Sequence, residues 1–285
     1  MAEMIGTIAS WTASDGYQGY YRLYLPPGSP QGSIVCLHGI QSHGGWYEYS
    51  CRQLAEAGYV VAFLDRRGSG LNFAHRGDTP SFQRLFQDVA EFIDHITKRF
   101  PETQGKVTLS ACSWGGKVAV GMCRDYGNLF QRMILICPGF FPQVGVPLPT
   151  KLKIGRSKAL RPTRGFDIPL NDPALFTTSE QWRTFLRNDP LALHQATARF
   201  LVESRRLDRY CLTAPAAVTM PVLLQLAGQD RIIRNEPTKE YVNSFATQAK
   251  RILEYPEAHH TLEFEPDPKT ILQDQIMWLT SKGPH

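Results

Sequence analysis

The sequence predicts an α/β fold, with a mostly parallel central sheet covered by helices on both faces. Short apolar runs alternate along the chain with amphipathic stretches, which is the pattern of strands joined by crossover helices. The chain has 285 residues and 42% hydrophobic content, enough to supply a large core. One long irregular segment interrupts the alternation. These observations predict a single large domain with an insertion.

The strand-like runs are short, apolar and bounded by turn residues. In chain order they are 20–25, 33–37, 59–64, 107–111, 133–137, 222–227 and 251–255. The clearest helical pattern runs from 81 to 100, and its apolar residues recur in steps of three and four: Phe82, Leu85, Phe86, Val89, Phe92, Ile93 and Ile96. This stripe predicts a helix that covers one face of the sheet.

Between 142 and 220 the alternation is replaced by a proline-rich segment, followed by a helical pattern from about 191 to 209. Open α/β sheets bind ligands at the carboxyl ends of their strands. We therefore expect residues 142–220 to form a helical cap over that edge, and residues 1–141 and 221–285 to form the core domain.

The positive net charge of +5 is concentrated in one part of this insertion. Six cations occur between 151 and 164 without an intervening acid, namely Lys151, Lys153, Arg156, Lys158, Arg161 and Arg164. Such a run attracts anionic lipid surfaces or phosphorylated substrates, or is simply a solvated face. We expect at most a transient contact with an anionic membrane surface. No recognition motif accompanies the charge, so we expect no nucleic-acid partner.

The first residues lack the features of a secretory signal, and no run of about 18 apolar residues occurs. The six cysteines show no C-x-x-C spacing, and several lie in apolar runs, as buried free thiols do in a reducing compartment. These features favour a cytoplasmic location. The sequence leaves the oligomeric state open.

The stretch "LSACSWGGK" places Ser113 between a predicted strand and a helix from about 114 to 124. A nucleophilic serine on such a sharp turn needs small residues two positions before and after it, and Ala111 and Gly115 meet this need. Ser113 could equally be an ordinary helix cap. Cys112 is the other nucleophile to consider, but a packed thiol is the better interpretation of it.

A catalytic serine needs a base, and the base needs a carboxylate, in the chain order Ser, Asp, His on this architecture. Asp230 follows the strand at 222–227, and His259 and His260 follow the next strand. Each has an ordinary alternative use, as a turn residue or a solvated histidine. Their order and context favour a catalytic triad.

An oxyanion hole needs two backbone N–H groups. The loop after the strand at 33–37 can supply that of Ile40, and the turn after Ser113 can supply that of Trp114. In the same loop His38 and His43 could suggest a metal pair, but no third ligand has suitable spacing. We therefore expect no metal and no cofactor.

Two longer stretches carry a family resemblance. "LHGIQSHGGWYEYSCRQLAEAGYVVAFLDRRGSGLN" and "HHTLEFEPD" resemble the oxyanion-loop, D-x-R-G-x-G and histidine-loop regions of α/β-hydrolases of the monoacylglycerol lipase and lysophospholipase group. The likeness covers roughly 35–279 and weakens across the insertion. It implies that His260 is the catalytic base rather than His259, and that Asp65 holds a loop.

The elbow departs from the G-H-S-M-G-G that is usual in this family, because the chain reads A-C-S-W-G-G. We expect Trp114 to narrow the acyl pocket, and Phe140 and Phe141 to line it at the entrance of the insertion. The resemblance then implies a serine hydrolase that cleaves a small acyl ester, monoacylglycerol-like or lysophospholipid-like, with a short to medium acyl chain. A thioesterase or acyltransferase would use the same residues. A peptidase of the proline iminopeptidase type fits less well, because no carboxylate in the insertion clearly marks an amine-binding site. From a different class, a binding protein on a hydrolase scaffold is a further alternative.

Overall fold

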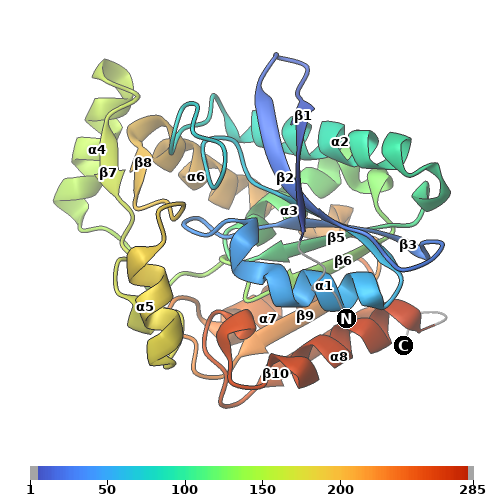
Figure 1. Cartoon of the computed structure of the whole chain (residues 1–285). Helices are drawn as coiled ribbons and strands as arrows, with labels where there is room; N and C mark the ends of the chain where they lie inside the picture. Colours follow the sequence, from blue (N-terminus) through green and yellow to red (C-terminus); the bar gives the residue numbers. More distant parts are fainter. Residues whose placement is uncertain (1–5, 282–285) are drawn as a thin grey trace.

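Eight strands form one sheet in the computed structural model, which describes residues 6–281. Their order in the sheet is β1-β2-β4-β3-β5-β6-β9-β10, and only β2 runs opposite to the others (Figure 1). The fold class predicted from the sequence is confirmed. The strands are β1 (Thr7–Thr12), β2 (Gln18–Tyr24), β3 (Gly32–Leu37), β4 (Tyr59–Leu64), β5 (Val107–Cys112), β6 (Arg132–Ile136), β9 (Val222–Ala227) and β10 (Lys250–Tyr255).

The central strands are apolar throughout because both of their faces are covered. Every residue of β3, β4, β5 and β9 is buried, as expected of parallel strands between two helical layers. Alternate side chains enter different cores: Val35 of β3 packs in the larger core, while Ile34 and Cys36 pack in the smaller one.

Helices cover both faces of the sheet. The larger core receives α2 (Phe82–Arg99), α3 (Gly115–Tyr126) and α6 (Ala198–Cys211), and the smaller core receives α1 (Glu48–Glu56) and α8 (Pro268–Thr280) (Figure 1). The helix predicted over 81–100 is α2. It begins after Ser81, whose side chain accepts a hydrogen bond from the N–H of Arg84, and it buries all seven apolar residues of its stripe. The remaining core helix, α7 (Asn235–Asn243), follows β9.

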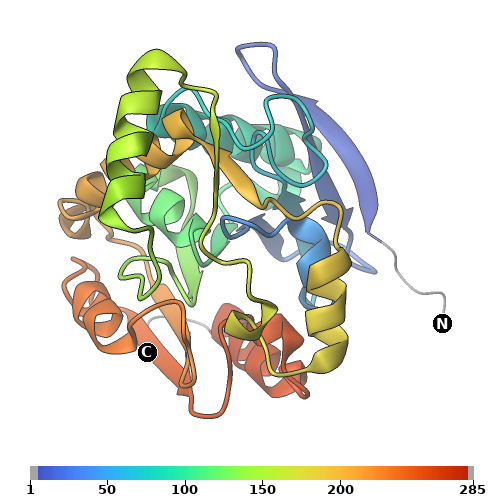
Figure 2. The same cartoon turned by 90° about the vertical axis from the view of Figure 1, so that its left-hand side faces the viewer.

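The segment between β6 and β9 contains both helices and a small sheet. In order it forms α4 (Leu148–Leu160), β7 (Gly165–Asp167), α5 (Glu180–Asn188), β8 (Gln195–Thr197) and then α6, with β7 and β8 paired antiparallel. The helix expected from about 191 begins only at Ala198, because the residues before it pair with β7. Figure 2 shows α4, α5 and the β7–β8 pair on the side of the molecule that faces the viewer.

Helix α6 packs against α4 and also against α3 and α2. It therefore joins the insertion to the helical layer of the core. The division into a core of 1–141 and 221–285 and a cap of 142–220 remains a proposal.

All six cysteines are buried and unpaired, as expected from the sequence. Among residues 6–281, none of the helices has the length and apolar content needed to cross a bilayer.

Candidate active site

Ser113 lies on a strained turn between β5 and α3. Its φ of 49° is in the left-handed region that few residues other than glycine adopt. The turn is held by the N–H of Ser113, which donates to the Ile136 carbonyl (2.9 Å), and by the Ser113 carbonyl, which accepts from Gly139 (2.8 Å). A Cβ at Gly115 would lie 2.8 Å from the His38 carbonyl oxygen, so a small residue is required there. The predicted elbow geometry is present.

Three side chains from separate loops meet at this turn. The Ser113 hydroxyl donates to His260 Nε2 (2.9 Å), and His260 Nδ1 donates to Asp230 Oδ2 (2.7 Å). The other carboxylate oxygen of Asp230 accepts the N–H groups of Ile232 (2.8 Å) and Ile233 (3.0 Å). The structure thus brings together the serine, histidine and aspartate that the sequence singled out.

Asp230 is ionised and fixed in place. Burial alone would raise the pKa of its carboxyl, but the positive field of His260, the hydrogen bond from it and the two backbone N–H groups outweigh burial and lower the pKa below its usual value. An ionised carboxylate at Nδ1 holds the imidazole in the tautomer whose Nε2 can accept the serine proton.

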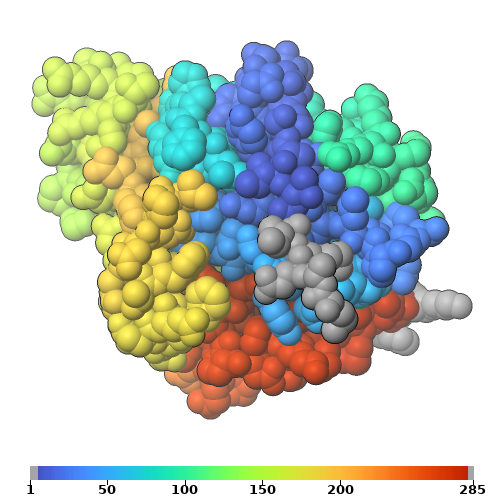
Figure 3. Space-filling view, in the orientation of Figure 1, coloured from blue at the N-terminus to red at the C-terminus, as the bar shows by residue number. Residues whose placement is uncertain are grey.

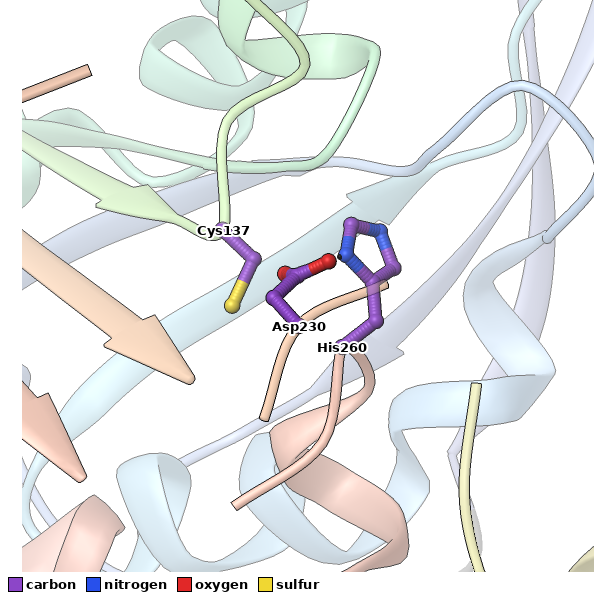
Figure 4. A group of neighbouring side chains, drawn as sticks. All are labelled: Cys137, Asp230 and His260. Atoms are coloured by element: carbon purple, nitrogen blue, oxygen red, sulfur yellow. Dashed lines mark hydrogen bonds and ion pairs between the residues drawn. The ribbon is translucent and has the colours of Figure 1, made fainter. Parts of the chain in front are cut away.

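Cys137 lies beside this pair, directly after β6, and the donor atoms of Cys137, Asp230 and His260 are within 4.8 Å of one another (Figure 4). Thiol, carboxylate and imidazole could together hold a soft metal ion. Here Nδ1 of His260 is already bonded to Asp230, and burial raises the pKa of the Cys137 thiol well above its usual value. This group is better explained as the acid and base of a triad with a neutral thiol packed against them.

His259 takes no part in this arrangement. Its backbone N–H donates to Glu265 Oε1 (2.7 Å), and its ring faces the same carboxylate. Asp65 accepts the N–H groups of Gly44 (2.7 Å) and Leu71 (2.8 Å), so it holds two loops together as expected from the sequence.

The loop of Gly39 and Ile40 lies against the serine. A Cβ at Gly39 would be 3.2 Å from Ser113 Cβ, so any larger residue would force the loop or the serine to shift by a few tenths of an ångström. Within residues 6–281, the N–H groups of Ile40 and Trp114 are bonded to no backbone or side-chain acceptor. Both groups are therefore free to bind a substrate oxygen.

A cavity of about 60 Å³ opens beside Ser113 and His260. At one side it is lined by Trp46 of the core and by Leu170 and Phe176 of the insertion. The Phe176 ring lies edge-on to His260, with ring centroids 6.1 Å apart. The Phe176 carbonyl also accepts the N–H of Thr261 (3.1 Å). The insertion is thus in direct contact with the predicted catalytic residues.

The three aromatic residues that we expected to line this cavity lie elsewhere. The Trp114 indole turns away and donates to Ser204 Oγ (2.8 Å) on α6. Phe140 and Phe141 pack against Tyr241, with ring centroids 4.8 and 5.9 Å from it. None of the three lines the cavity. Side chains of neighbouring residues at such a turn point in different directions. Trp114 therefore lies outside the cavity although it follows Ser113 directly in the sequence.

Sequence reasoning also missed the contact that fixes the insertion to the oxyanion loop. Asp189 Oδ2 accepts from His43 Nε2 (2.9 Å) and from Trp46 Nε1 (2.6 Å), and all three side chains are buried. Burial would raise the pKa of Asp189, but the hydrogen bonds from His43 and Trp46 lower it to about 2. His43 was noticeable in the sequence because it lies in the oxyanion loop. No motif or pattern around Asp189 in the sequence indicates that it contacts this loop.

Comparisons with known proteins show that the chain is similar in sequence to lipases. The monoacylglycerol lipase of Mycolicibacterium smegmatis is 24% identical over 95% of this chain and 96% of its own length. The phospholipase YtpA of Bacillus subtilis is 24% identical over 86% of this chain and 93% of its own.

Solved structures share the fold. The monoacylglycerol lipase of Paleococcus ferrophilus matches with a TM-score of 0.82 at 19% identity, over 92% of this chain and 98% of that one. A soluble variant of the monoglyceride lipase of Saccharomyces cerevisiae matches with a TM-score of 0.84 at 18% identity, over 98% of this chain and 96% of that one. A family model described as "Serine aminopeptidase, S33" matches residues 28–267, well over half of the chain. The chain therefore belongs to the serine aminopeptidase S33 family of α/β-hydrolases.

Proposed function

We propose that this protein is a serine hydrolase that cleaves small carboxylic esters through an acyl-enzyme on Ser113. The observation that carries the proposal is the continuous hydrogen-bonded path from the Ser113 hydroxyl through His260 to Asp230. The names of the relatives, which are lipases and a phospholipase, support an ester rather than an amide substrate.

In the first step the Ser113 oxygen attacks the ester carbonyl carbon while His260 Nε2 takes its proton. The N–H groups of Ile40 and Trp114 bind the oxygen that becomes negative. His260 then returns the proton to the departing alcohol. Water attacks the acyl-enzyme with the same base, which releases the acid and restores Ser113. None of these steps calls for a metal or cofactor.

The size of the cavity favours short to medium acyl chains. About 60 Å³ holds on the order of five water molecules, so a longer acyl chain must displace some of the side chains that line the cavity. From the insertion, Leu170 and Phe176 are the apolar residues that line the cavity, in place of the expected Trp114, Phe140 and Phe141. We therefore propose a monoacylglycerol- or lysophospholipid-like substrate with a short to medium acyl group.

Hydrolysis of p-nitrophenyl butyrate tests the proposal, with Ser113→Ala as the inactive control. A matched thioester, a glycerol acceptor and an aminoacyl p-nitroanilide separate the thioesterase, acyltransferase and aminopeptidase alternatives, which would use the same triad. Activity that is equal in the wild type and in Ser113→Ala would refute the assignment. Absence of activity on every substrate would favour the binding-protein alternative.

We also propose that the exposed helix α4 contacts anionic membrane surfaces. Leu148, Leu152 and Leu160 are each about two-thirds exposed. Leu152 and Leu160 lie within the cationic run 151–164, and Leu148 lies just before it. In the space-filling view the residues of α4 project from the upper left of the molecule (Figure 3). Exposed leucines beside lysines and arginines suit an anionic lipid surface. The buried free cysteines support a cytoplasmic location as part of this proposal.

A further inference from the structure

Arg66 is a mostly buried cation two residues past the end of β4, beside the loop that carries Ile40. Within residues 6–281, no carboxylate oxygen lies within 4.0 Å of its guanidinium. Its Nε atom is buried without a hydrogen-bond partner. Burial lowers the pKa of the side chain to about 9, so it still carries its charge at neutral pH. Buried cations are normally paired with carboxylates. The charge of Arg66 must therefore be stabilised by other groups.

The guanidinium is bound to two consecutive carbonyls of the oxyanion loop. Nη1 donates to the Gly39 carbonyl (3.1 Å) and Nη2 donates to the Ile40 carbonyl (3.1 Å). A trans peptide is planar, and its C=O and N–H point in opposite directions. When the Gly39 carbonyl is bound to Arg66, the N–H of Ile40 in the same peptide must point away from Arg66. This is the N–H that is free to bind a substrate oxygen.

His38 holds the same carbonyl from a second direction. Its Nδ1 donates to the Gly39 carbonyl (2.7 Å), and its Nε2 accepts the backbone N–H of Arg66 (2.9 Å). Burial, reinforced by the nearby charge of Arg66, lowers the pKa of His38 well below its usual value, so the ring is neutral as this pattern requires. The Gly39–Ile40 peptide is therefore fixed by one neutral donor and one charged donor.

Aromatic rings fix the guanidinium in turn. It lies 4.9 Å from the centre of the Trp114 ring and 5.1 Å from that of Phe200. The Trp114 indole is itself anchored to Ser204 on α6. This gives a physical role to the tryptophan that replaces the methionine usual at the elbow, because its side chain supports Arg66 instead of lining the cavity.

We propose that Arg66 is a positioning residue for the reaction, which holds the Gly39–Ile40 peptide so that the Ile40 N–H faces the developing oxyanion. Its charge also polarises this peptide, because a hydrogen bond to a carbonyl strengthens the N–H of the same amide as a donor. The inference rests on the proposed ester hydrolysis at Ser113. Trp114 then acts twice, through its own N–H and through the ring that supports Arg66.

The test compares Arg66→Met, which keeps an apolar side chain against the rings but loses both donors, with Arg66→Lys and Arg66→Ala. We expect Arg66→Met to lower kcat by about 10- to 100-fold, less than the 10²- to 10³-fold loss that follows removal of an oxyanion donor itself. KM should change by less than about threefold, because the ground-state carbonyl depends little on this donor. Arg66→Lys should be intermediate, and added guanidinium ion should partly restore Arg66→Ala.

Arg132→Met is the matched control. Arg132 also donates to backbone carbonyls, that of Trp278 among them (3.2 Å), and its guanidinium lies 5.5 Å from the Trp278 ring. It stands at the first residue of β6, at the opposite end of the sheet from Ser113. This variant should lower the Tm and leave kcat unchanged.

The rate at which a fluorophosphonate labels Ser113 separates failure of this inference from failure of the proposed function. If the wild type is not labelled at Ser113, the proposed function fails. If the wild type is labelled and Arg66→Met is labelled at least about 10-fold more slowly, while Arg132→Met is not slowed, the inference stands. Equal rates for the wild type and Arg66→Met, equal slowing in both variants, or no rescue of Arg66→Ala by guanidinium would overturn it.

Discussion

We predict that Glu263 makes this protein less stable as the pH rises from 5 to 8, the opposite of what an ordinary carboxylate does. Its side chain is 8% exposed, in the short helix η6 (Leu262–Phe264). The carboxyl accepts the N–H (3.1 Å) and the hydroxyl of Ser50 near the start of α1. Burial raises the pKa of Glu263 from 4.5 to about 7, although the hydrogen bonds from Ser50 and Tyr49 oppose this.

The sign and size of the effect follow from proton binding. Because the folded-state pKa is above the unfolded one, the folded protein binds more protons, and the contribution is fully present below pH 4.5 and is lost as pH rises through 7. A shift of 2.5 pKa units at 1.36 kcal/mol each corresponds to roughly 3 kcal/mol, most of it lost between pH 5 and pH 8. Glu263→Gln removes the titrating group and keeps the size of the side chain.

Urea unfolding at several pH values between 5 and 8 gives the free energy of unfolding of both proteins. The wild-type value minus that of Glu263→Gln should fall by about 2 to 3 kcal/mol over this range. The other titrating groups are common to both proteins and cancel in the difference. A difference that stays constant, or rises with pH, would mean that Glu263 is ionised at the start of α1, and the reasoning from burial would be refuted.

Three further predictions concern the site and the insertion. Asp230→Asn should lower kcat on p-nitrophenyl butyrate by on the order of 10³- to 10⁴-fold with an unchanged circular dichroism spectrum, since Asn cannot stabilise the imidazolium; a loss below tenfold would remove Asp230 from the triad. Phe176→Ala should shift the acyl length with the highest kcat/KM upward across a series of acetyl to decanoyl esters, because each additional buried CH₂ contributes about 0.8 kcal/mol. Trp114→Met should leave this optimum unchanged. If Trp114→Met shifts the optimum and Phe176→Ala does not, Trp114 lines the acyl pocket after all. Replacing Lys151, Lys153 and Arg156 by Gln should weaken binding to phosphatidylglycerol vesicles at low salt by up to about 3 kcal/mol, at about 1 kcal/mol per charge. If replacing Lys98, Lys106 and Lys269 weakens binding equally, α4 has no specific role at the membrane and is only a solvated face.

Local pattern predicted the central strands well because these strands are buried on both sides. Strands β4 and β9 have the predicted bounds, 59–64 and 222–227, and their apolar runs are continuous. The edge strand β1 is mostly exposed and polar in part, so it carried no such signal. The residues before α6 were read as helix because their pairing partner, β7, lies some 30 residues earlier in the chain.

The site residues likewise fall into those that a local pattern predicted and those that it could not predict. Ser113, Asp230 and His260 each follow a predicted strand, and parallel strands bring their carboxyl ends to one edge of the sheet. The positions of Trp114, Phe140 and Phe141 depended on the direction of each side chain, which the sequence does not specify. Arg66 and Asp189 act through contacts across 27 and 146 positions of the chain, to Gly39 and His43 respectively, and no local pattern reports these.

The most direct test of the central claim is to trap the acyl-enzyme. The wild type is mixed with excess p-nitrophenyl butyrate and quenched in acid within the first turnovers, and the modified residue is identified by peptide mass spectrometry. We expect one butyryl group per protein, on the peptide that contains Ser113, and none in Ser113→Ala. A butyryl group on Cys112, on His260 or on any residue of Ser113→Ala, or turnover of the ester without an acylated intermediate, would contradict the account.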